Sequence, residues 1–179
     1  MSVTQLRRPA EMILNLPPRL VFAAIAAATL GLVLAGVFYF QAELGLEPCP
    51  MCILSRFTFI GIGAVSLVAA IHGPRGIALK AYGGIVALLA ATGIGISIRH
   101  SYLQHFPPKV ESCGADLEFI LNTMPLSQAF PRIFAGTGSC SRVDWTFLGL
   151  SIPEWAGVWY VIFLVAALWT ALRRPAAPA

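Results

Sequence analysis

Long uncharged stretches dominate the chain and recur four times. They run over residues 20–40, 53–71, 81–98 and 155–172, and Arg56 is the only charged residue inside them. A helix needs roughly 20 apolar residues to cross the hydrocarbon core of a bilayer, so each stretch has the length of one transmembrane helix. Strands of a membrane barrel would alternate apolar and polar residues, which these stretches do not. The pattern predicts a bundle of four transmembrane helices.

The composition fits an all-α membrane protein. Of the 179 residues, 58% are hydrophobic and only 11% are charged, and the mean hydropathy is +0.78. Soluble domains carry about 25% charged residues. The length accommodates one integral membrane domain over residues 1–179 without a second globular domain. The net charge is +4, but the basic residues form no patch, so we expect no nucleic-acid partner.

The first hydrophobic stretch follows Arg7, Arg8 and Arg19 and in this respect looks like a secretory signal. The hydrophobic region of a signal peptide spans only about 7–15 residues. This stretch has 21 residues, and no small-residue cleavage site follows it. We interpret it as a retained membrane anchor.

The Lys and Arg residues divide unequally between the two ends of the predicted bundle. Residues 1–19, 72–80 and 173–179 together hold seven bases and one acid, whereas the opposite side holds five bases and seven acids. By the positive-inside rule, the first set is cytoplasmic, and so are both termini. The external loops then cover approximately residues 41–52 and 99–154.

This orientation places all four cysteines on the external side. Cys49 and Cys52 fall in the short loop that ends at the second helix, and Cys113 and Cys140 fall in the long loop. External thiols meet an oxidising compartment, so these cysteines can form disulfides.

The long loop has its own apolar periodicity. Apolar residues recur at helical spacing over 117–124 and nearly repeat over 126–134. Two interpretations stay open, a short helix in the membrane interface and apolar packing within the loop. The segment 136–139, Gly-Thr-Gly-Ser, is typical of a flexible chain, so we expect Cys140 to be mobile.

Cys49-Pro50-Met51-Cys52 is the most distinctive motif. A C-x-x-C at the start of a helix places the second sulfur near unpaired backbone N–H groups and the positive end of the helix dipole, which stabilise a thiolate. Pro50 suits such a start, because the missing N–H of a proline costs nothing in the first turn. We therefore predict that Cys52 is the nucleophile.

Arg56 lies four residues after Cys52, so its guanidinium can share a helix face with that sulfur. A charge inside a spanning helix is costly and is usually functional. The alternative is snorkelling, in which the long side chain only reaches the headgroup region. We favour a functional role, because Arg56 is the only charge in the four stretches and is close to the C-x-x-C motif.

Cys113 and Cys140 are separated by 26 residues. They can form a disulfide that only clamps the loop, contribute to a four-thiolate zinc site, or act as the second dithiol of a relay. Zinc sites usually combine two close pairs, so we expect no metal. Two dithiols on one face of a membrane favour a relay, because thiolate attack on a disulfide passes two electrons through a mixed disulfide.

Taken together, the motifs and their order along the chain resemble those of the bacterial disulfide bond formation protein B (DsbB) family. Its members are membrane oxidases that reduce a quinone and regenerate the periplasmic thiol oxidase DsbA. The resemblance covers nearly the whole chain. It rests on Phe40-Gln41, Pro48-Cys49-x-x-Cys52 with Arg56, His100 with Leu103-Gln104 and Pro107, Cys113, Cys140, and Trp145-x-Phe147-Leu148-Gly149-Leu150-x-x-Pro153-x-Trp155.

The resemblance implies a role for each cysteine. Cys113 would form the mixed disulfide with a DsbA-like partner, and Cys140 would carry the exchange to Cys49. Cys52, as a thiolate, would contact ubiquinone or menaquinone. The resemblance also implies a multi-pass protein of the bacterial inner membrane with its cysteines in the periplasm.

Further site residues follow from the same resemblance. Arg56 matches the family arginine near the quinone and would stabilise the thiolate and the charge that develops on a quinone oxygen. His100 matches a family histidine at the outer end of the third helix and would bind quinone or supply a proton; the alternative is an interfacial histidine bound to backbone or water. Gln41 would help to line the site. The family often has an acidic residue where this chain has Ser55.

The main hypothesis is therefore a disulfide-generating enzyme, a protein-thiol:quinone oxidoreductase. DsbA is a strong oxidant, at about −120 mV, so only a stronger acceptor can keep it oxidised. A vitamin K epoxide reductase-like protein is an alternative, but the redox motif of such proteins follows their loop cysteines, whereas here it comes first. A non-catalytic membrane protein with structural disulfides or a metal site is another.

Overall fold

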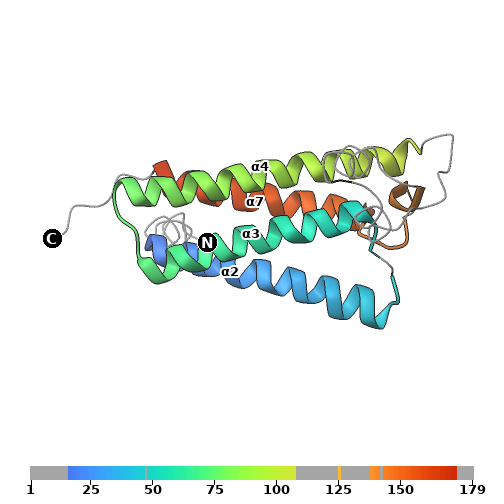
Figure 1. The fold of residues 1–179 in the computed structure, drawn as a ribbon, viewed down its shortest axis with the longest axis horizontal. Helices are drawn as coiled ribbons and strands as arrows, with labels where there is room; N and C mark the ends of the chain where they lie inside the picture. Colours follow the sequence, from blue (N-terminus) through green and yellow to red (C-terminus); the bar gives the residue numbers. More distant parts are fainter. Residues whose placement is uncertain (1–15, 47, 108–124, 126–137, 142, 173–179) are drawn as a thin grey trace, which may run out of the picture.

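The computed structural model describes residues 16–46, 48–107, 125, 138–141 and 143–172. Four long helices form an elongated bundle in which successive helices run in opposite directions (Figure 1). They are α2 (Pro18–Leu34), which continues into the π-helix η1 (Ala35–Glu43), α3 (Pro50–His72), α4 (Ile77–His105) and α7 (Ile152–Leu172). The predicted all-α bundle of four membrane-spanning helices is confirmed.

The helices are longer than the uncharged stretches that predicted them. The four spans have 26, 23, 29 and 21 residues. The largest difference is in α4, which continues past Ile98 to His105. Gln104 therefore lies on a helix, although the sequence pattern placed residues 99–154 in a loop. His100 lies near the outer end of the third spanning helix, as the family resemblance implied. The polar residues next to an apolar stretch can still be helical, because the backbone hydrogen bonds of the helix continue beyond the apolar segment.

The most extensive helix contact joins α4 and α7. Small residues on α4 allow this close approach: a Cβ on Gly93 would lie 2.4 Å from the ring of Tyr160, and a Cβ on Gly83 would lie 2.8 Å from Ala171. In a bilayer, such small residues permit the dense van der Waals packing that holds helices together.

Stacked aromatic rings fill the centre of the bundle. Phe59 on α3 stacks on Tyr160 of α7 with ring centroids 4.2 Å apart, and Phe163 meets Phe59 edge-on at 6.3 Å. Other large apolar side chains point outward, for example Leu30 and Leu88, which are 60% and 69% exposed. Spanning helices present such side chains to lipid, so this exposure is consistent with a membrane environment.

Helix α2 packs against α3 but diverges from α7 toward the end of the bundle where α3 begins (Figure 1). The close contact lies in the middle of α2, where a Cβ on Gly63 would be 2.6 Å from Thr29 Oγ1. Beyond this contact, α2 continues into η1. Residues of both η1 and α7 line the cavity described below.

Local caps fix where the helices end. Arg19 donates two hydrogen bonds of 3.0 Å to backbone carbonyls in the last turn of α3, and Gly73 terminates that helix with a φ of +62°. At the other end of the bundle, the backbone N–H of Ser151 donates to Glu154 Oε2 at 2.7 Å. This is one half of a capping box, and it defines the start of α7.

Short elements precede α7. They are one turn of 3-10 helix, η2 (Gly138–Ser141), and a hairpin of β1 (Thr146–Phe147) and β2 (Leu150–Ser151). Leu148 and Gly149, with φ values of +52° and +81°, make the two-residue turn. Positive φ at both positions is what a tight hairpin of this kind requires.

Two predictions concern parts of the chain outside the described residues. One is the role of Cys113, and the other is the short helix over 117–124 and 126–134. Both stay predictions.

Candidate functional site

The C-x-x-C motif lies at the N-terminus of α3, as predicted. Cys49 is the N-cap residue, Pro50 is in the first turn, and Cys49 Sγ lies 3.1 Å from Cys52 Sγ. The backbone N–H of Cys52 donates to Cys49 Sγ at 3.4 Å. This N–H therefore serves the first sulfur, whereas the sequence led us to expect such donors at the second. Of the two cysteines, Cys49 is buried and Cys52 is half-buried.

Cys49 is buried against two residues from distant parts of the chain. Cys49 is 7% exposed, His100 on α4 is 4% exposed, and Cys140 on η2 is fully buried. Cys49 Sγ, Cys140 Sγ and a ring nitrogen of His100 all lie within 4.8 Å of one another. Hydrogen bonding with Cys140, hydrogen bonding with Cys52 and burial raise the pKa of the Cys49 thiol. When reduced, Cys49 is therefore held in its protonated form.

Cys140 is less accessible than its glycine-rich surroundings predict. The sequence indicated a mobile cysteine, but η2 places its side chain in the buried cluster with Cys49. A side chain that is completely buried reaches solvent only when the surrounding structure opens. The sulfur of Cys140 therefore lies beside that of Cys49 and not at the surface.

Arg56 points toward η1. Its guanidinium donates to the backbone carbonyl of Gly36 at 2.9 Å and to Gln41 Oε1 at 2.8 Å. Both acceptors lie on the π-helix, whose wider turns change the side-chain register relative to an α-helix and occur frequently at functional sites. These hydrogen bonds tie the half-buried guanidinium to η1, whereas a snorkelling side chain would extend freely to the headgroup region.

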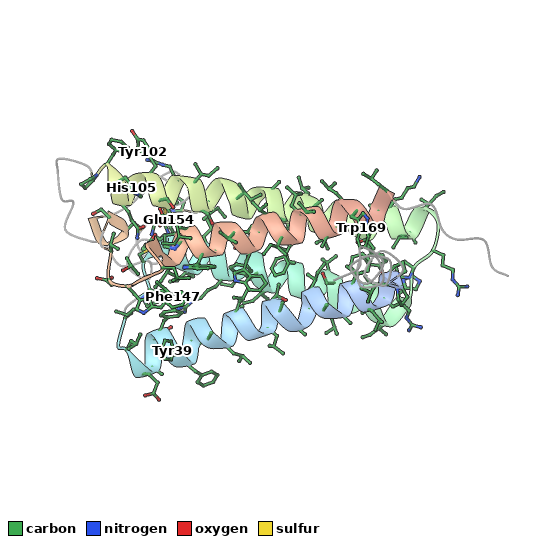
Figure 2. All side chains as sticks on the ribbon, turned by 180° about the vertical axis from the view of Figure 1, so that it is seen from behind. Tyr39, Tyr102, His105, Phe147, Glu154 and Trp169 are labelled. Carbon is green, nitrogen blue, oxygen red and sulfur yellow. The ribbon has the colours of Figure 1, made fainter. Side chains whose placement is uncertain are left out.

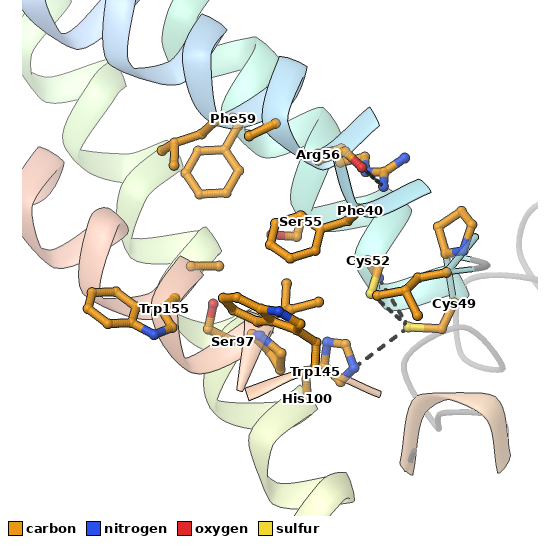
Figure 3. A pocket seen from close by; sticks show the side chains of 18 of the residues that line it. Phe40, Cys49, Cys52, Ser55, Arg56, Phe59, Ser97, His100, Trp145 and Trp155 are labelled. Carbon is orange, nitrogen blue, oxygen red and sulfur yellow. Dashed lines mark hydrogen bonds between the residues drawn. The ribbon is translucent and has the colours of Figure 1, made fainter. Parts of the chain in front are cut away.

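A cavity of about 350 Å³ opens beside Cys52 and Arg56. Its walls come from all four long helices and from the segment before α7, and they are mostly apolar. Figure 3 shows Cys52, Arg56 and His100 toward one side of this cavity and Phe59 and Trp155 toward the other. Cavities of roughly 300–1,000 Å³ with few polar groups are typical of small-molecule sites.

Aromatic side chains build one wall of the cavity. Phe40 meets Trp145 edge-on at 4.9 Å, and Trp145 stacks on Phe147 at 5.9 Å. The Trp155 indole N–H donates to the Phe147 carbonyl at 3.0 Å, which ties the hairpin to α7. The wall is therefore apolar and aromatic, and the indole N–H of Trp155 is already paired.

Ser55 and Tyr160 form a contact at the cavity that the sequence did not reveal. Their hydroxyl oxygens lie 2.9 Å apart, and Tyr160 Oη is also 2.8 Å from the Ser55 carbonyl, to which it donates. The two side chains thus form a neutral link between α3 and α7. Tyr160 lies within an uninterrupted apolar stretch, so no sequence signal distinguished it from an ordinary core residue.

Comparison with known proteins identifies the family. Residues 18–170 match the family model of "Disulfide bond formation protein DsbB". The chain belongs to this family. It is 44% identical over 156 residues to the disulfide bond formation protein B of Aromatoleum aromaticum, which covers 87% of this chain and 93% of that relative. The proteins of the same name from Azoarcus sp. and Saccharophagus degradans are 42% and 44% identical, covering 87% and 84% of this chain and 93% and 90% of those relatives.

Family membership confirms the resemblance drawn from the motifs and, with the four spanning helices, indicates a multi-pass bacterial membrane protein. It also indicates an oxidoreductase of disulfide bond formation. The structure also brings predicted site residues from separate elements to one end of the bundle. These residues are Gln41, Cys49, Cys52, Arg56, His100 and Cys140.

Proposed function

We propose that this DsbB family member is a protein-thiol:quinone oxidoreductase. It takes two electrons from a periplasmic DsbA-like thiol oxidase and delivers them to ubiquinone or menaquinone. The observation that carries the proposal is that the C-x-x-C motif and Arg56 line the same cavity of about 350 Å³. A redox-active sulfur beside a fixed cation suits an acceptor whose oxygens gain negative charge on reduction.

Electron transfer within the chain is a thiol–disulfide exchange that starts from a Cys49–Cys52 disulfide. The Cys140 thiolate attacks Cys49 Sγ, a Cys49–Cys140 bond forms, the Cys49–Cys52 bond breaks, and Cys52 leaves as a thiolate. One disulfide replaces another, so electrons balance. The step is supported by the closeness of the sulfurs, with Cys49 Sγ 3.1 Å from Cys52 Sγ and within 4.8 Å of Cys140 Sγ.

The cavity fits a quinone head group. Phe40, Trp145 and Trp155 provide flat apolar surfaces, which bind a ring and exclude water. When bound, the quinone supplies the two-electron acceptor. Arg56 provides a fixed positive charge near the Cys52 sulfur, and His100, 3.6 Å from Cys49 Sγ, is positioned to exchange a proton with that thiol.

The DsbA-like partner is assigned to Cys113, which would form the mixed disulfide before Cys140 carries the exchange inward. This route requires the cysteine end of the bundle to face the periplasm and both termini to lie in the cytoplasm of a bacterial inner membrane. The basic residues Arg19, Arg75 and Lys80, at the other end, support that orientation.

Sidedness can be tested in intact cells with a membrane-impermeant maleimide after mild reduction. We expect the native cysteines to be labelled before permeabilisation. A variant that lacks them and carries Arg75→Cys, in the opposite turn, should be labelled only afterwards. The reverse pattern would contradict the proposed route.

The activity can be tested with the full-length protein in lipid nanodiscs, a reduced DsbA-like protein and a quinone. We expect one quinol for each partner disulfide formed. Cys49→Ser and Cys52→Ser should abolish turnover, whereas Ser101→Ala, a substitution outside the cavity lining, should retain it. Undiminished turnover by either cysteine variant would reject the role of the C-x-x-C motif.

A further inference from the structure

The buried end of the site contains a group of metal-binding side chains. Cys49, at the start of α3, His100, on α4, and Cys140, on η2, are all buried, and their ligand atoms lie within 4.8 Å of one another. Sequence spacing predicted no metal, because only the four cysteines were considered and their second pair is widely spaced. The structure adds a histidine to two cysteines from different pairs.

The separation between Cys49 and His100 matches that between two ligands of a tetrahedral zinc ion, and Cys140 Sγ lies within 4.8 Å of both. Zinc lies about 2.3 Å from a thiolate sulfur and about 2.0–2.1 Å from an imidazole nitrogen, so two such ligands are roughly 3.5–3.8 Å apart. His100 Nε2 lies 3.6 Å from Cys49 Sγ. The Cys52 sulfur, 3.1 Å from Cys49 Sγ, is near enough to supply a fourth ligand after a small side-chain movement.

The chemistry of the ligands and the local charge also favour such an ion. Thiolate and imidazole groups select soft or borderline cations such as Zn²⁺ over Mg²⁺ or Ca²⁺. Three thiolates and one divalent cation leave a net charge of −1, and the guanidinium of Arg56, which lines the same cavity as Cys49 and Cys52, balances it. Paired charges lower the cost of a buried ionic site.

We propose that the reduced protein binds one zinc-class ion through Cys49, His100 and Cys140, with Cys52 as the fourth ligand. Binding forms metal–sulfur bonds and releases the thiol protons to solvent, and no electrons move. The ion cannot bind in this way once Cys49 is in a disulfide, because its sulfur is no longer a thiolate. If the proposed function holds, the ion also blocks exchange between Cys140 and Cys49, so zinc is a reversible inhibitor of the reduced state.

The binding test uses the full-length protein with Cys113→Ser, so that every remaining thiol belongs to the cluster. The protein is reduced, freed of reductant and titrated with Co²⁺, whose thiolate charge-transfer absorption reports the ligands, and then with Zn²⁺. We expect one equivalent of Co²⁺ per chain, displaced by Zn²⁺. After chemical oxidation of the same protein, the absorption should be absent. If the oxidised and reduced forms bound Co²⁺ equally well, the proposal would be overturned. This comparison requires no substitution of a cluster residue.

Variants locate the site. Cys140→Ser and His100→Ala each remove a proposed ligand. Since loss of an outer-shell partner alone costs about 10–100-fold in metal affinity, each variant should weaken Co²⁺ binding roughly tenfold or more. The matched control is His105→Ala on the same helix; His105 is exposed, and its Nε2 lies 3.9 Å from Glu154 at the edge of the bundle (Figure 2). Thermal unfolding of each variant shows whether it is folded. Parent-like binding by both cluster variants would overturn the proposal.

The outcome is separable from that of the proposed function, because binding is measured without quinone or partner. A protein that binds the ion but never reduces quinone would contradict only the oxidoreductase proposal. A protein that reduces quinone but binds no Co²⁺ would contradict only the metal site.

Discussion

Arg56 on α3 donates a hydrogen bond of 2.8 Å to the side-chain oxygen of Gln41 on η1. The second acceptor of the guanidinium, the Gly36 carbonyl, lies on the same π-helix at 2.9 Å. The guanidinium of Arg56 is thus oriented by η1, the segment that continues α2 where that helix diverges from α7. Gln41 acts on the proposed reaction through Arg56 and is a positioning residue.

Gln41→Ala removes one acceptor and leaves the guanidinium freer to turn. A hydrogen bond to a charged group contributes about 1.5–3 kcal/mol when buried, and less at an exposed side chain such as Gln41. We therefore expect the KM for quinone to rise about three- to tenfold with a smaller change in kcat. Steady-state kinetics in nanodiscs measures both, and Glu43→Gln on the same π-helix is the control. A parent-like KM for Gln41→Ala would show that the contact does not position Arg56.

Arg56 itself is expected to matter through both its charge and its shape. Arg56→Ala should lower kcat/KM for quinone by about 100-fold or more, because it removes the fixed charge. Arg56→Lys should fall between Ala and the parent, since an ammonium keeps the charge but lacks the planar fork that reaches both acceptors.

The control for these variants is the loop disulfide between Cys113 and Cys140, which does not involve Cys52. Thiol titration should show that this disulfide still forms in Arg56→Ala. If quinone KM and turnover were unchanged in that variant, Arg56 would be a snorkelling residue.

The membrane fold was predictable because its signals are local. Four uncharged stretches are enough to count the spanning helices, and the cap at Cys49 follows from a proline in the next position. The extent of α4 was not predictable in the same way. Gln104 is polar and looked like a loop residue, but a neighbouring segment supplies a partner, because Ser151 Oγ donates to Gln104 Oε1 at 2.8 Å.

The geometry of the site depends on contacts that sequence spacing does not encode. Cys49 and Cys140 meet through the packing of three elements, and only the family resemblance indicated that they would. The π-helix that turns Gln41 toward Arg56 has no sequence signature here. Tyr160 bonds Ser55 from within an apolar helix, and nothing in its composition separated that tyrosine from the lipid-facing residues around it.

The pKa of Cys49 predicts how the stability of the reduced protein depends on pH. Hydrogen bonding with Cys140, hydrogen bonding with Cys52 and burial raise that pKa above its ordinary value of 9.0. The folded state thus keeps a proton that the unfolded chain loses. The stabilisation from this group is complete below 9.0 and is lost as pH rises from there toward the folded pKa.

Thermal unfolding of the reduced protein between about pH 7.5 and pH 10.5 measures the effect. The Tm should fall more steeply above pH 9.0 for the parent than for Cys49→Ser, which lacks the titrating group. Comparing the two slopes removes the contribution of tyrosines and lysines, which both proteins share. Identical slopes would mean that Cys49 titrates alike in the folded and unfolded states.

The contact between α4 and α7 gives a prediction about stability that does not depend on the proposed activity. A Cβ on Gly93 would lie 2.4 Å from the ring of Tyr160, closer than any relaxed contact, so Gly93→Ala must displace the ring or separate the helices. Overpacking of this kind typically costs about 1–3 kcal/mol. Displacing Tyr160 also disturbs its hydrogen bonds to Ser55, at the cavity wall.

Gly95 is the matched control for this substitution, because it lies on the same helix and has open space where a Cβ would be. Alanine is about 1 kcal/mol more favourable than glycine inside a helix, so Gly95→Ala should keep or raise the Tm in detergent while Gly93→Ala lowers it. Because the displaced ring borders the cavity wall at Ser55, Gly93→Ala should also weaken quinone binding, and Gly95→Ala should not. Equal Tm values for the two variants would show that α4 and α7 are not packed as closely as the Gly93–Tyr160 contact requires.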